Sequence, residues 1–213
     1  MQVSDTEISL QNNAVGNNAR KRSPVKIPHY AIEEIKELGH NQAITGYLQS
    51  RGVWHGAQGR LKEVYYYVED QKKQRKHFFG AGWQNEMGSW EIRNPYFKGC
   101  LGHKAISFIP GDESKLSVFE GYLNYLSWLT ENPFATDSIL VLNTINLLEV
   151  AIRKADDFTD ISLFFDLDKK GCQAAIDFKS AVREAVDRSS AYVGFNDYND
   201  KITAELKQFS QQR

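Results

Sequence analysis

The sequence is poor in the features that define several protein classes. It has only two cysteines, Cys100 and Cys172, among 213 residues, too few for a disulfide framework or a four-thiolate zinc site. Its longest purely apolar runs, such as Ile139–Leu142, span four or five residues, whereas a membrane-spanning helix needs about 20. The N-terminus is polar and has no apolar signal-peptide core. We therefore expect a soluble protein of a reducing compartment, the cytoplasm, with no membrane partner.

The composition is that of an ordinary folded protein. Hydrophobic residues make up 41%, aromatic residues 12% and charged residues 25%, which argues against disorder throughout the chain. At about 150 residues per domain, the length accommodates one α/β domain with a small addition. Residues 1–26 are the exception, because they are rich in Asn, Gln and Ser and show no apolar periodicity. We interpret them as a disordered tail or linker, in which the basic cluster Arg20–Arg22 is either a solvated tether or a nucleic-acid contact.

Charge is unevenly distributed, although the net charge is only −1. Residues 72–104 carry seven basic and two acidic residues, a net of +5, whereas residues 105–200 carry eight basic and sixteen acidic residues, a net of −8. This pattern suits a protein that holds a polyanion in one place and a cation in another. Two solvated surfaces of different charge would give the same counts.

The first half of the chain predicts a small α+β unit. Apolar residues recur at helical spacing, first at Ile32, Ile35 and Leu38 and then over Ile44–Leu48, which predicts two short helices. Three β-type stretches follow, at Glu63–Val68, His77–Trp83 and Ser89–Arg93. We expect them to form an antiparallel meander. Its aromatic residues interleave with basic ones, as in platforms for single-stranded nucleic acid, although we expect most of these rings to form the meander's own core.

After Gly102 the pattern changes to alternating strands and helices. Strands are expected at Ala105–Ile109, Leu116–Phe119, Ile139–Leu142, Ile161–Phe165 and Ala191–Phe195. Helices are expected at Tyr122–Leu129, Ile145–Ala155, Gln173–Val186 and about Lys201–Phe209. This alternation predicts the α/β class, with a parallel sheet covered by helices on both faces.

Acidic residues follow three of these five predicted strands. Glu120 follows the second strand, Asp166 and Asp168 follow the fourth, and Asp197 and Asp200 follow the fifth. Because ligands of an open α/β sheet bind at the carboxyl ends of its strands, we expect these acids to meet at one edge. Converging carboxylates suit Mg²⁺, which takes one or two of them together with substrate phosphates. Helix N-capping would explain a single Asp, but it requires neither the Asp-x-Asp spacing nor Glu120.

Three strings carry these acids: KLSVFEGYLNYLSWL (115–129), ISLFFDLDKKGCQAAIDF (161–178) and GFNDYNDKI (194–202). In this order they resemble the three motifs of the Toprim domain, which bacterial primases, type IA and type II topoisomerases and several nucleases share. The likeness is strongest to primase-like Toprim proteins carried by mobile elements of Bacteroidetes. The string HFFGAGWQNEMGSWEIRNPYFKGC (77–100) resembles the basic subdomain that precedes Toprim in such primases. The resemblance covers about residues 28–210 and implies a basic α+β subdomain at 27–104, which contacts nucleic acid, and a Toprim catalytic domain at 105–213.

The resemblance implies nucleotidyl transfer dependent on Mg²⁺ or Mn²⁺, namely primer synthesis from NTPs on single-stranded DNA during replication of a mobile element. It makes Glu120 the general acid/base, and Asp166, Asp168 and Asp197 metal ligands. The basic residues expected to hold phosphates of the template or the nucleotide are Arg93, Lys98, Lys104, Lys169 and Lys170. For the last two, an exposed loop pair is an equally good interpretation.

The chain also departs from the primase pattern. The aspartate that replicative primases usually carry four residues after the glutamate is Asn124 here, and their Asp-Pro-Asp is Asp197-Tyr198-Asn199, with Asp200 as a substitute. Their zinc ribbon and helicase-binding domain are missing, and we interpret Cys100 and His103 as structural because no second pair accompanies them. We therefore expect a truncated chain or a protein that has lost its ribbon. A replicative helicase or a separate zinc-ribbon module is then a candidate partner.

Two other functions are compatible with the same residues. A Toprim nuclease would use the same carboxylates to hydrolyse phosphodiesters. A nucleic-acid-binding module with a decayed site would explain the two asparagines at acidic positions of the motifs. A topoisomerase is disfavoured, because the chain has no room for a domain that carries the nucleophilic tyrosine.

Overall fold

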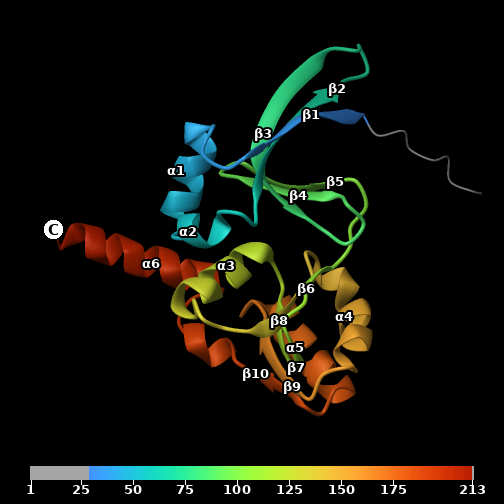
Figure 1. Ribbon diagram of the computed structural model, residues 1–213, viewed down its shortest axis with the longest axis vertical. Coiled ribbons are helices and arrows are strands. Elements are labelled where there is room, and N and C mark those ends of the chain that lie inside the picture. Colours follow the sequence, from blue (N-terminus) through green and yellow to red (C-terminus); the bar gives the residue numbers. More distant parts are fainter. Residues whose placement is uncertain (1–28, 213) are drawn as a thin grey trace, which may run out of the picture.

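The computed structural model describes residues 29–212 and contains two β-sheets, one in the upper and one in the lower half of Figure 1. The first sheet is antiparallel and runs in sequence order through β1 (Tyr30–Glu37), β2 (Lys62–Glu69), β3 (Arg75–Gln84), β4 (Trp90–Asn94) and β5 (Phe97–Leu101). Helices α1 (Gln42–Ser50) and α2 (Trp54–Ala57) connect β1 to β2. This confirms the predicted meander and adds a strand at each end of it. The predicted tail at 1–26 lies outside the described residues.

Strand β1 takes the place of the first predicted helix. Ile32 and Ile35 are three residues apart, as on one face of a helix, but Ile32 pairs with Tyr66 and Ile35 pairs with Val64 of β2. A β-bulge directly after Ile32 inserts one extra residue, so both isoleucines lie on the same face of the sheet. The prediction of a helix here was wrong because a bulged strand reproduces helical spacing.

Helix α1 confirms the second predicted helix, and a buried carboxylate fixes its start. The Oε1 atom of Glu63 accepts hydrogen bonds from the backbone N–H groups of residues 39–41 at 2.8–2.9 Å. A negative charge is favoured here because the first amides of a helix lack partners within the helix. Burial by itself would raise the pKa of Glu63, but these bonds and one from Tyr65 lower it. The start of the helix that carries Arg51 at its far end is thereby held in place.

The second sheet has the order β10-β9-β7-β8-β6. Strands β7 (Asp112–Phe119), β8 (Asp137–Val141), β9 (Asp160–Phe164) and β10 (Ala185–Asp187) are parallel, and β6 (Ser107–Ile109) is an antiparallel edge strand. The helices of this half are α3 (Tyr122–Glu131), α4 (Leu148–Ala155), α5 (Lys169–Ala181) and α6 (Tyr198–Gln211), with 3₁₀ turns at Ile145–Leu147 and Ser189–Tyr192. The predicted α/β class is confirmed, as is parallel pairing for four strands, but the strand expected at Ala105–Ile109 forms an antiparallel edge instead. Among residues 29–212, no helix combines the length and apolarity needed to cross a bilayer.

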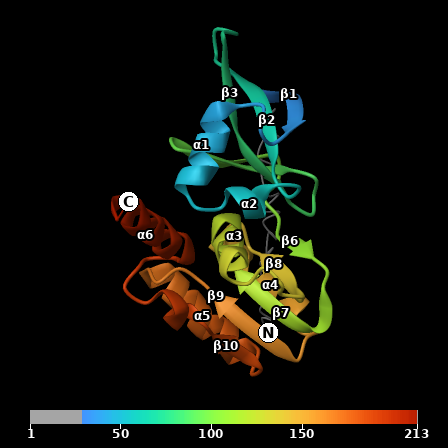
Figure 2. The same ribbon diagram turned by 60° about the vertical axis from the view of Figure 1, so that its left-hand side comes forward.

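Helices cover both faces of the second sheet, as predicted. Helices α4 and α5 pack on one face, and α3 and α6 pack on the other. The core under α3 and α6 also includes Ala81 and Trp83 of β3. The Trp83 ring stacks on Tyr122 with 5.9 Å between the centroids, and the Tyr122 hydroxyl donates to the Ala81 carbonyl at 3.2 Å. The two sheets therefore share a core, and Figure 2 shows α2 and α3 where the two halves meet.

The chain after α5 differs from the prediction. The expected strand at Ala191–Phe195 is wrong, because this segment begins in a 3₁₀ turn that buries Tyr192, whose hydroxyl donates to the Phe165 carbonyl at 2.7 Å. The helix expected over Gln173–Val186 ends at Ala181, and the edge strand β10 occupies its last residues. Short edge strands limit the pairing of a sheet with other chains, and the three residues of β10 are too few to show an alternating pattern in the sequence.

Candidate active site

Two of the predicted acids follow neighbouring parallel strands. Glu120 comes directly after β7, and Asp166 comes two residues after β9. The two strands pair up to their last residues, Phe119 and Phe164, whose rings stack with centroids 4.9 Å apart. Because the strands are parallel, their carboxyl ends lie side by side. Both carboxylates consequently line one cleft.

The other two predicted acids cap helices. Asp168 caps α5, and its Oδ1 accepts from the N–H groups of Lys170 and Gly171 at 2.8 Å. Asp197 caps α6 by accepting from the Asp200 N–H at 2.7 Å, and it lines the same cleft as Glu120. Asp168 is exposed. The capping interpretation is therefore correct for both, and Asp197 lies in the cleft as well.

The opposite wall of the cleft is basic and comes from the first sheet. Arg93 of β4 and Lys98 of β5 are cross-strand partners, so they share a face of the sheet, and both line the cleft. Arg51, the C-cap residue of α1, lies there too. Its Nη2 is 3.7 Å from Asp200 Oδ1, and its Nε is buried without a hydrogen-bond partner. The sequence prediction missed Arg51, because a helical pattern does not reveal what the end of the helix faces.

The cations of this wall are poorly neutralised. Within residues 29–212, neither Arg93 nor Lys98 has a carboxylate oxygen within 4.0 Å. Partial desolvation and the nearby Arg93 lower the pKa of Lys98, whereas the charges of Glu120 and Asp166 act in the opposite direction. The two walls are thus close enough to interact but are not paired with each other. The acid wall therefore offers carboxylates to a cation, and the basic wall offers Arg93 and Lys98 to an anion.

Burial makes the acids of the cleft unusually basic. It raises the pKa of Asp166 to about 7, with additional repulsion from Glu120 and Asp197. It also raises the pKa of Glu120, which Lys98 partly offsets, and the pKa of Asp197. Glu120 Oε2 is buried and has no hydrogen-bond partner. Carboxylates in this situation are stabilised by a proton or a cation.

The acid wall fits a divalent cation of the Mg²⁺ type. In the part of the chain that the structure describes, no three His, Cys, Asp or Glu side chains converge closely enough to enclose an ion. Mg²⁺ does not need such a cage, because it binds one or two carboxylates and completes its shell with water and substrate phosphates. Asp166 with Glu120 or Asp197 would supply these ligands. The unpartnered oxygen of Glu120 and the crowded charge at Asp166 are the features that a cation would satisfy.

Two buried asparagines link the acid wall to the helices behind it. Asn124 of α3 donates from Nδ2 to Asp166 Oδ1 at 2.8 Å, and its Oδ1 accepts from the Asn199 N–H at 3.4 Å. Asn199 donates from Nδ2 to the Arg51 carbonyl at 2.9 Å and to Ser127 Oγ at 2.7 Å. The sequence alone treats both asparagines as lost acids. In the structure they form a continuous polar chain that ends at Asp166.

The remaining predicted basic residues lie elsewhere. Lys104 pairs with Glu91 at 2.9 Å, and Lys169 and Lys170 are exposed in the first turn of α5. The cleft lining includes Arg93 and Lys98 of the predicted set, but not these three lysines. Their contact with phosphates stays a prediction.

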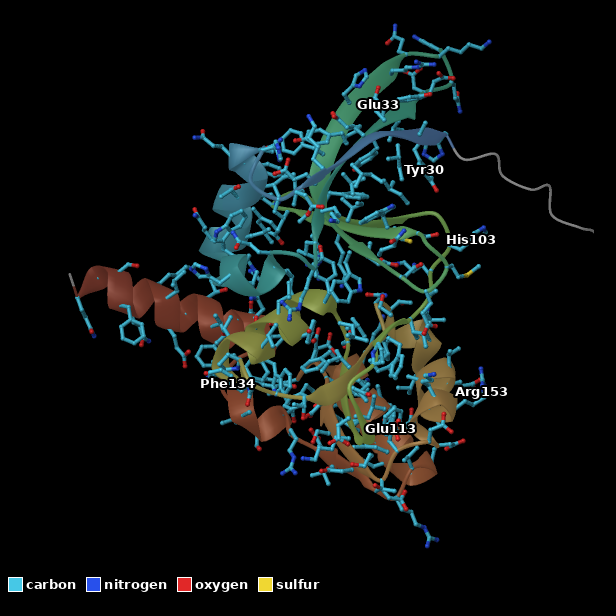
Figure 3. The ribbon with its side chains drawn as sticks, in the orientation of Figure 1. Tyr30, Glu33, His103, Glu113, Phe134 and Arg153 are labelled. Atoms are coloured by element: carbon cyan, nitrogen blue, oxygen red, sulfur yellow. The ribbon has the colours of Figure 1, made fainter. Side chains whose placement is uncertain are left out.

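Cys100 and His103 serve the structure, as the sequence suggests. Cys100 Sγ donates to the His103 carbonyl at 3.6 Å, and burial raises the pKa of this thiol to about 12. The His103 N–H donates to Ser89 Oγ at 2.9 Å. His103 lies in the segment that connects the two sheets, where Figure 3 labels it. The backbone of His103 is thus bonded to the neutral thiol of Cys100 and to the side chain of Ser89, which holds the connecting segment in place.

The aromatic residues of the first sheet divide between its core and an open face. Tyr66 and Trp90 are buried within the sheet's own core, and Trp83 is buried in the shared core. Tyr65 and Phe79 pair on the face of the sheet that also carries Trp83, with centroids 6.2 Å apart, and here Phe79 is 39% exposed. Ala81 on this face pairs with Arg93. The open aromatic face therefore adjoins the basic wall along β3.

The chain is similar to one protein family over its first sheet and to solved structures over most of its length. A family model described as "Domain of unknown function (DUF8464)" matches residues 32–102, which make up the first sheet and its helices. No curated protein matches the chain. The primase fragment of the bacteriophage T7 primase-helicase protein has a TM-score of 0.47 and 15% identity, covering 78% of this chain and 68% of that one. A chain from a structure of the bacteriophage T7 lagging-strand DNA polymerase with primase domains, an RNA/DNA hybrid and dTTP has a TM-score of 0.48 and 15% identity, covering 84% and 88%.

Proposed function

We propose that this chain is a primase-like nucleotidyltransferase with a Toprim-type catalytic unit, which uses Mg²⁺ or Mn²⁺ and NTPs to make RNA primers on single-stranded DNA. The observation that carries the proposal is the cleft whose two walls carry charges of opposite sign that form no ion pair with each other. Phosphoryl transfer needs a cation at the reacting phosphate, a proton acceptor and donors for the remaining phosphate charge. This one cleft has residues for all three tasks.

Each wall has a distinct role in the proposed reaction. Glu120, whose pKa is raised by burial, takes the proton of the attacking hydroxyl group. Asp166 and Asp197 line the cleft and would hold the metal. The resemblance adds Asp168 as a third ligand, although it is exposed and does not line the cleft. When bound, the ion neutralises charge that develops on the transferred phosphoryl group.

The basic wall would bind the phosphates of the nucleotide and the template. Lys98 acts by charge, and the two arginines, Arg51 and Arg93, can also form bidentate hydrogen bonds to phosphate oxygens. Template bases would stack on the open face of Tyr65 and Phe79, since single-stranded nucleic acid binds to aromatic rings next to cations. Lys104, Lys169 and Lys170 are proposed phosphate contacts outside the cleft.

The biological setting that we propose rests on the sequence motifs. It is DNA replication of a mobile element in the cytoplasm, with a replicative helicase or a separate zinc-ribbon module as the partner. Both partners would supply functions that the motifs of this chain do not include.

The proposal is tested by incubating the protein with labelled single-stranded DNA and Mg²⁺, with and without NTPs. New short RNA that depends on NTPs supports the proposal, whereas shortening of the DNA without NTPs identifies a nuclease. Glu120→Gln should abolish the product, because the proton acceptor is lost while the shape is kept. Glu113→Gln is the matched control, since this exposed glutamate lies near the opposite end of β7 and is labelled far from α3 in Figure 3.

Metal binding is measured separately from turnover. Calorimetry with Mg²⁺ or Mn²⁺ in the presence of single-stranded DNA should detect binding to the wild type and none to Asp166→Ala/Asp168→Ala. Salt-sensitive DNA binding that ignores the metal and survives the double substitution would instead identify a non-catalytic binding module.

A further inference from the structure

Asn124 contacts a proposed metal ligand from a position where related motifs carry an acid. The replicative primases that the motifs resemble usually have aspartate four residues after the glutamate, and this chain has Asn124. The Asn124 side chain is buried, and its Nδ2 donates to Asp166 Oδ1 at 2.8 Å. Its Oδ1 accepts from the backbone of Asn199, so the amide is held at both ends.

The chemistry of this contact depends on the amide. Two carboxylates at hydrogen-bond distance repel each other unless a proton or a cation lies between them. A carboxamide opposite a carboxylate needs neither, because it supplies the N–H itself. In this chain the Asn124 amide therefore holds the Asp166 carboxylate in place, as a bound cation would hold two facing carboxylates.

Asn199 likewise acts through its neutral amide, which donates hydrogen bonds that a carboxylate could not. Its Nδ2 donates to the Arg51 carbonyl and to Ser127 Oγ, and an aspartate has no donor for either acceptor. Asp200, the acid that follows, has its carboxylate 3.7 Å from Arg51 Nη2 and does not line the cleft. The acids that line the cleft are then Glu120, Asp166 and Asp197.

We propose that Asn124 is a positioning residue that substitutes for a cation: it holds Asp166 through an uncharged hydrogen bond, so that the metal-free site is already formed and the cleft takes a single divalent ion. This inference rests on the proposed metal-dependent function. It adds that one ion binds per chain and that Asn124 makes a second ion unnecessary. Preformed sites lose less affinity to ordering their ligands when the ion binds.

The test compares wild type with Asn124→Asp by thermal unfolding at pH 8, in EDTA and in saturating Mn²⁺, together with calorimetric Mn²⁺ stoichiometry. We expect one ion per wild-type chain. Asn124→Asp should lower Tm in EDTA by about 2–4 °C, because two carboxylates then face each other, and Mn²⁺ should restore most of the loss. The rise in Tm on adding Mn²⁺ is then larger for the variant than for the wild type.

Asn132→Asp is the matched control on the same helix. Its amide donates to the Trp128 carbonyl at 2.9 Å, so the substitution should lower Tm without recovery in Mn²⁺. If Asn124→Asp does not fold, Asn124→Ala takes its place and should weaken Mn²⁺ binding about tenfold, equivalent to 1.4 kcal/mol, because Asp166 is no longer held.

Two ions per wild-type chain, a Tm loss in Asn124→Asp that Mn²⁺ does not restore, or unchanged affinity in Asn124→Ala would each overturn the inference and leave the proposed function standing. If the wild type binds no Mn²⁺ at all, with or without DNA, the proposed function fails and the inference fails with it.

Discussion

Among the acids of the cleft, Asp166 is the one whose charge most destabilises the folded protein. It is partly buried next to Glu120 and Asp197, and only the Asn124 amide donates to its side chain among the hydrogen bonds of residues 29–212. Its folded-state pKa of about 7 lies far above the usual value of 3.8. Sites that bind ions commonly accept such local instability, because the ligand removes it.

This shift predicts the pH dependence of stability without metal. Between about pH 4 and pH 7 the folded state keeps a proton on Asp166 that the unfolded state loses, so the free energy of unfolding falls as pH rises through this window. Asp166→Asn removes this loss. At roughly 1.4 kcal/mol per pKa unit, the variant should exceed the wild type at pH 8 by an amount on the order of 2–4 kcal/mol and should match it only at about pH 4 and below.

Urea unfolding in EDTA at a series of pH values measures this difference, and saturating Mg²⁺ should reduce it. Asp177→Asn, on the exposed side of α5, is the control and should follow the wild-type curve. Parallel curves for the wild type and Asp166→Asn would contradict the assigned environment of Asp166.

At the scale of elements, the first turn of α5 packs closely against the loop that carries Asp166, between β9 and α5. A Cβ atom on Gly171 would lie 2.0 Å from the Asp166 carbonyl oxygen, a distance that only glycine permits. The Asp168 cap and this close approach together fix the path of the chain from β9 into α5. The position of Asp166 therefore depends on a residue without a side chain.

Gly171→Ala should destabilise the protein by about 1–3 kcal/mol, the usual cost of overpacking, and should weaken Mn²⁺ binding, because the backbone of Asp166 has to move. Gly46→Ala in α1 is the matched control: nothing lies within 4 Å of its Cβ position, and alanine should stabilise that helix by about 0.5–1 kcal/mol. Chemical unfolding with Mn²⁺ calorimetry measures both effects. Equal stability of the two variants would refute the close-approach argument.

At the scale of the whole molecule, the charge asymmetry of the sequence becomes two walls of one cleft. The positive wall belongs to α1, β4 and β5, and the negative wall belongs to loops of the parallel sheet. The shared core around Trp83 and Tyr122 holds the two halves against each other. Neither half alone would provide both the acid wall and the basic wall.

Arg93→Ala/Lys98→Ala should therefore weaken the binding of single-stranded DNA and reduce its salt dependence. Each lost phosphate contact lowers the slope of log K against log salt by about 0.7, so the double substitution should lower it by about 1.4. Fluorescence anisotropy between 50 and 200 mM salt, a range over which such contacts are resolved, measures the slope.

The control Arg153→Ala/Lys154→Ala removes the same two residue types from α4, on the outer side of the second sheet, where Figure 3 labels Arg153. Its slope should equal that of the wild type. An equal loss of slope in both double variants would show that binding follows net charge rather than the cleft.

The sequence by itself determined the class of the fold and the acid edge. Short, mostly apolar runs such as Leu116–Phe119 and Ile161–Phe165 are typical of strands in a sheet buried on both faces, and acids that follow such strands fall at the carboxyl edge of the sheet. These conclusions depend on local patterns, and local patterns are visible along the chain.

Only the tertiary structure decided what depends on contacts between distant residues. The bulge at β1 made a strand look helical, and β10 was too short to be recognised, because pairing with a neighbouring strand defines both elements. Likewise, Arg51 joined the site and Asn124 became a support for Asp166 through hydrogen bonds between helices far apart in sequence. Side-chain partners across a core leave no periodicity in the sequence, so their roles emerge only when the chain is folded.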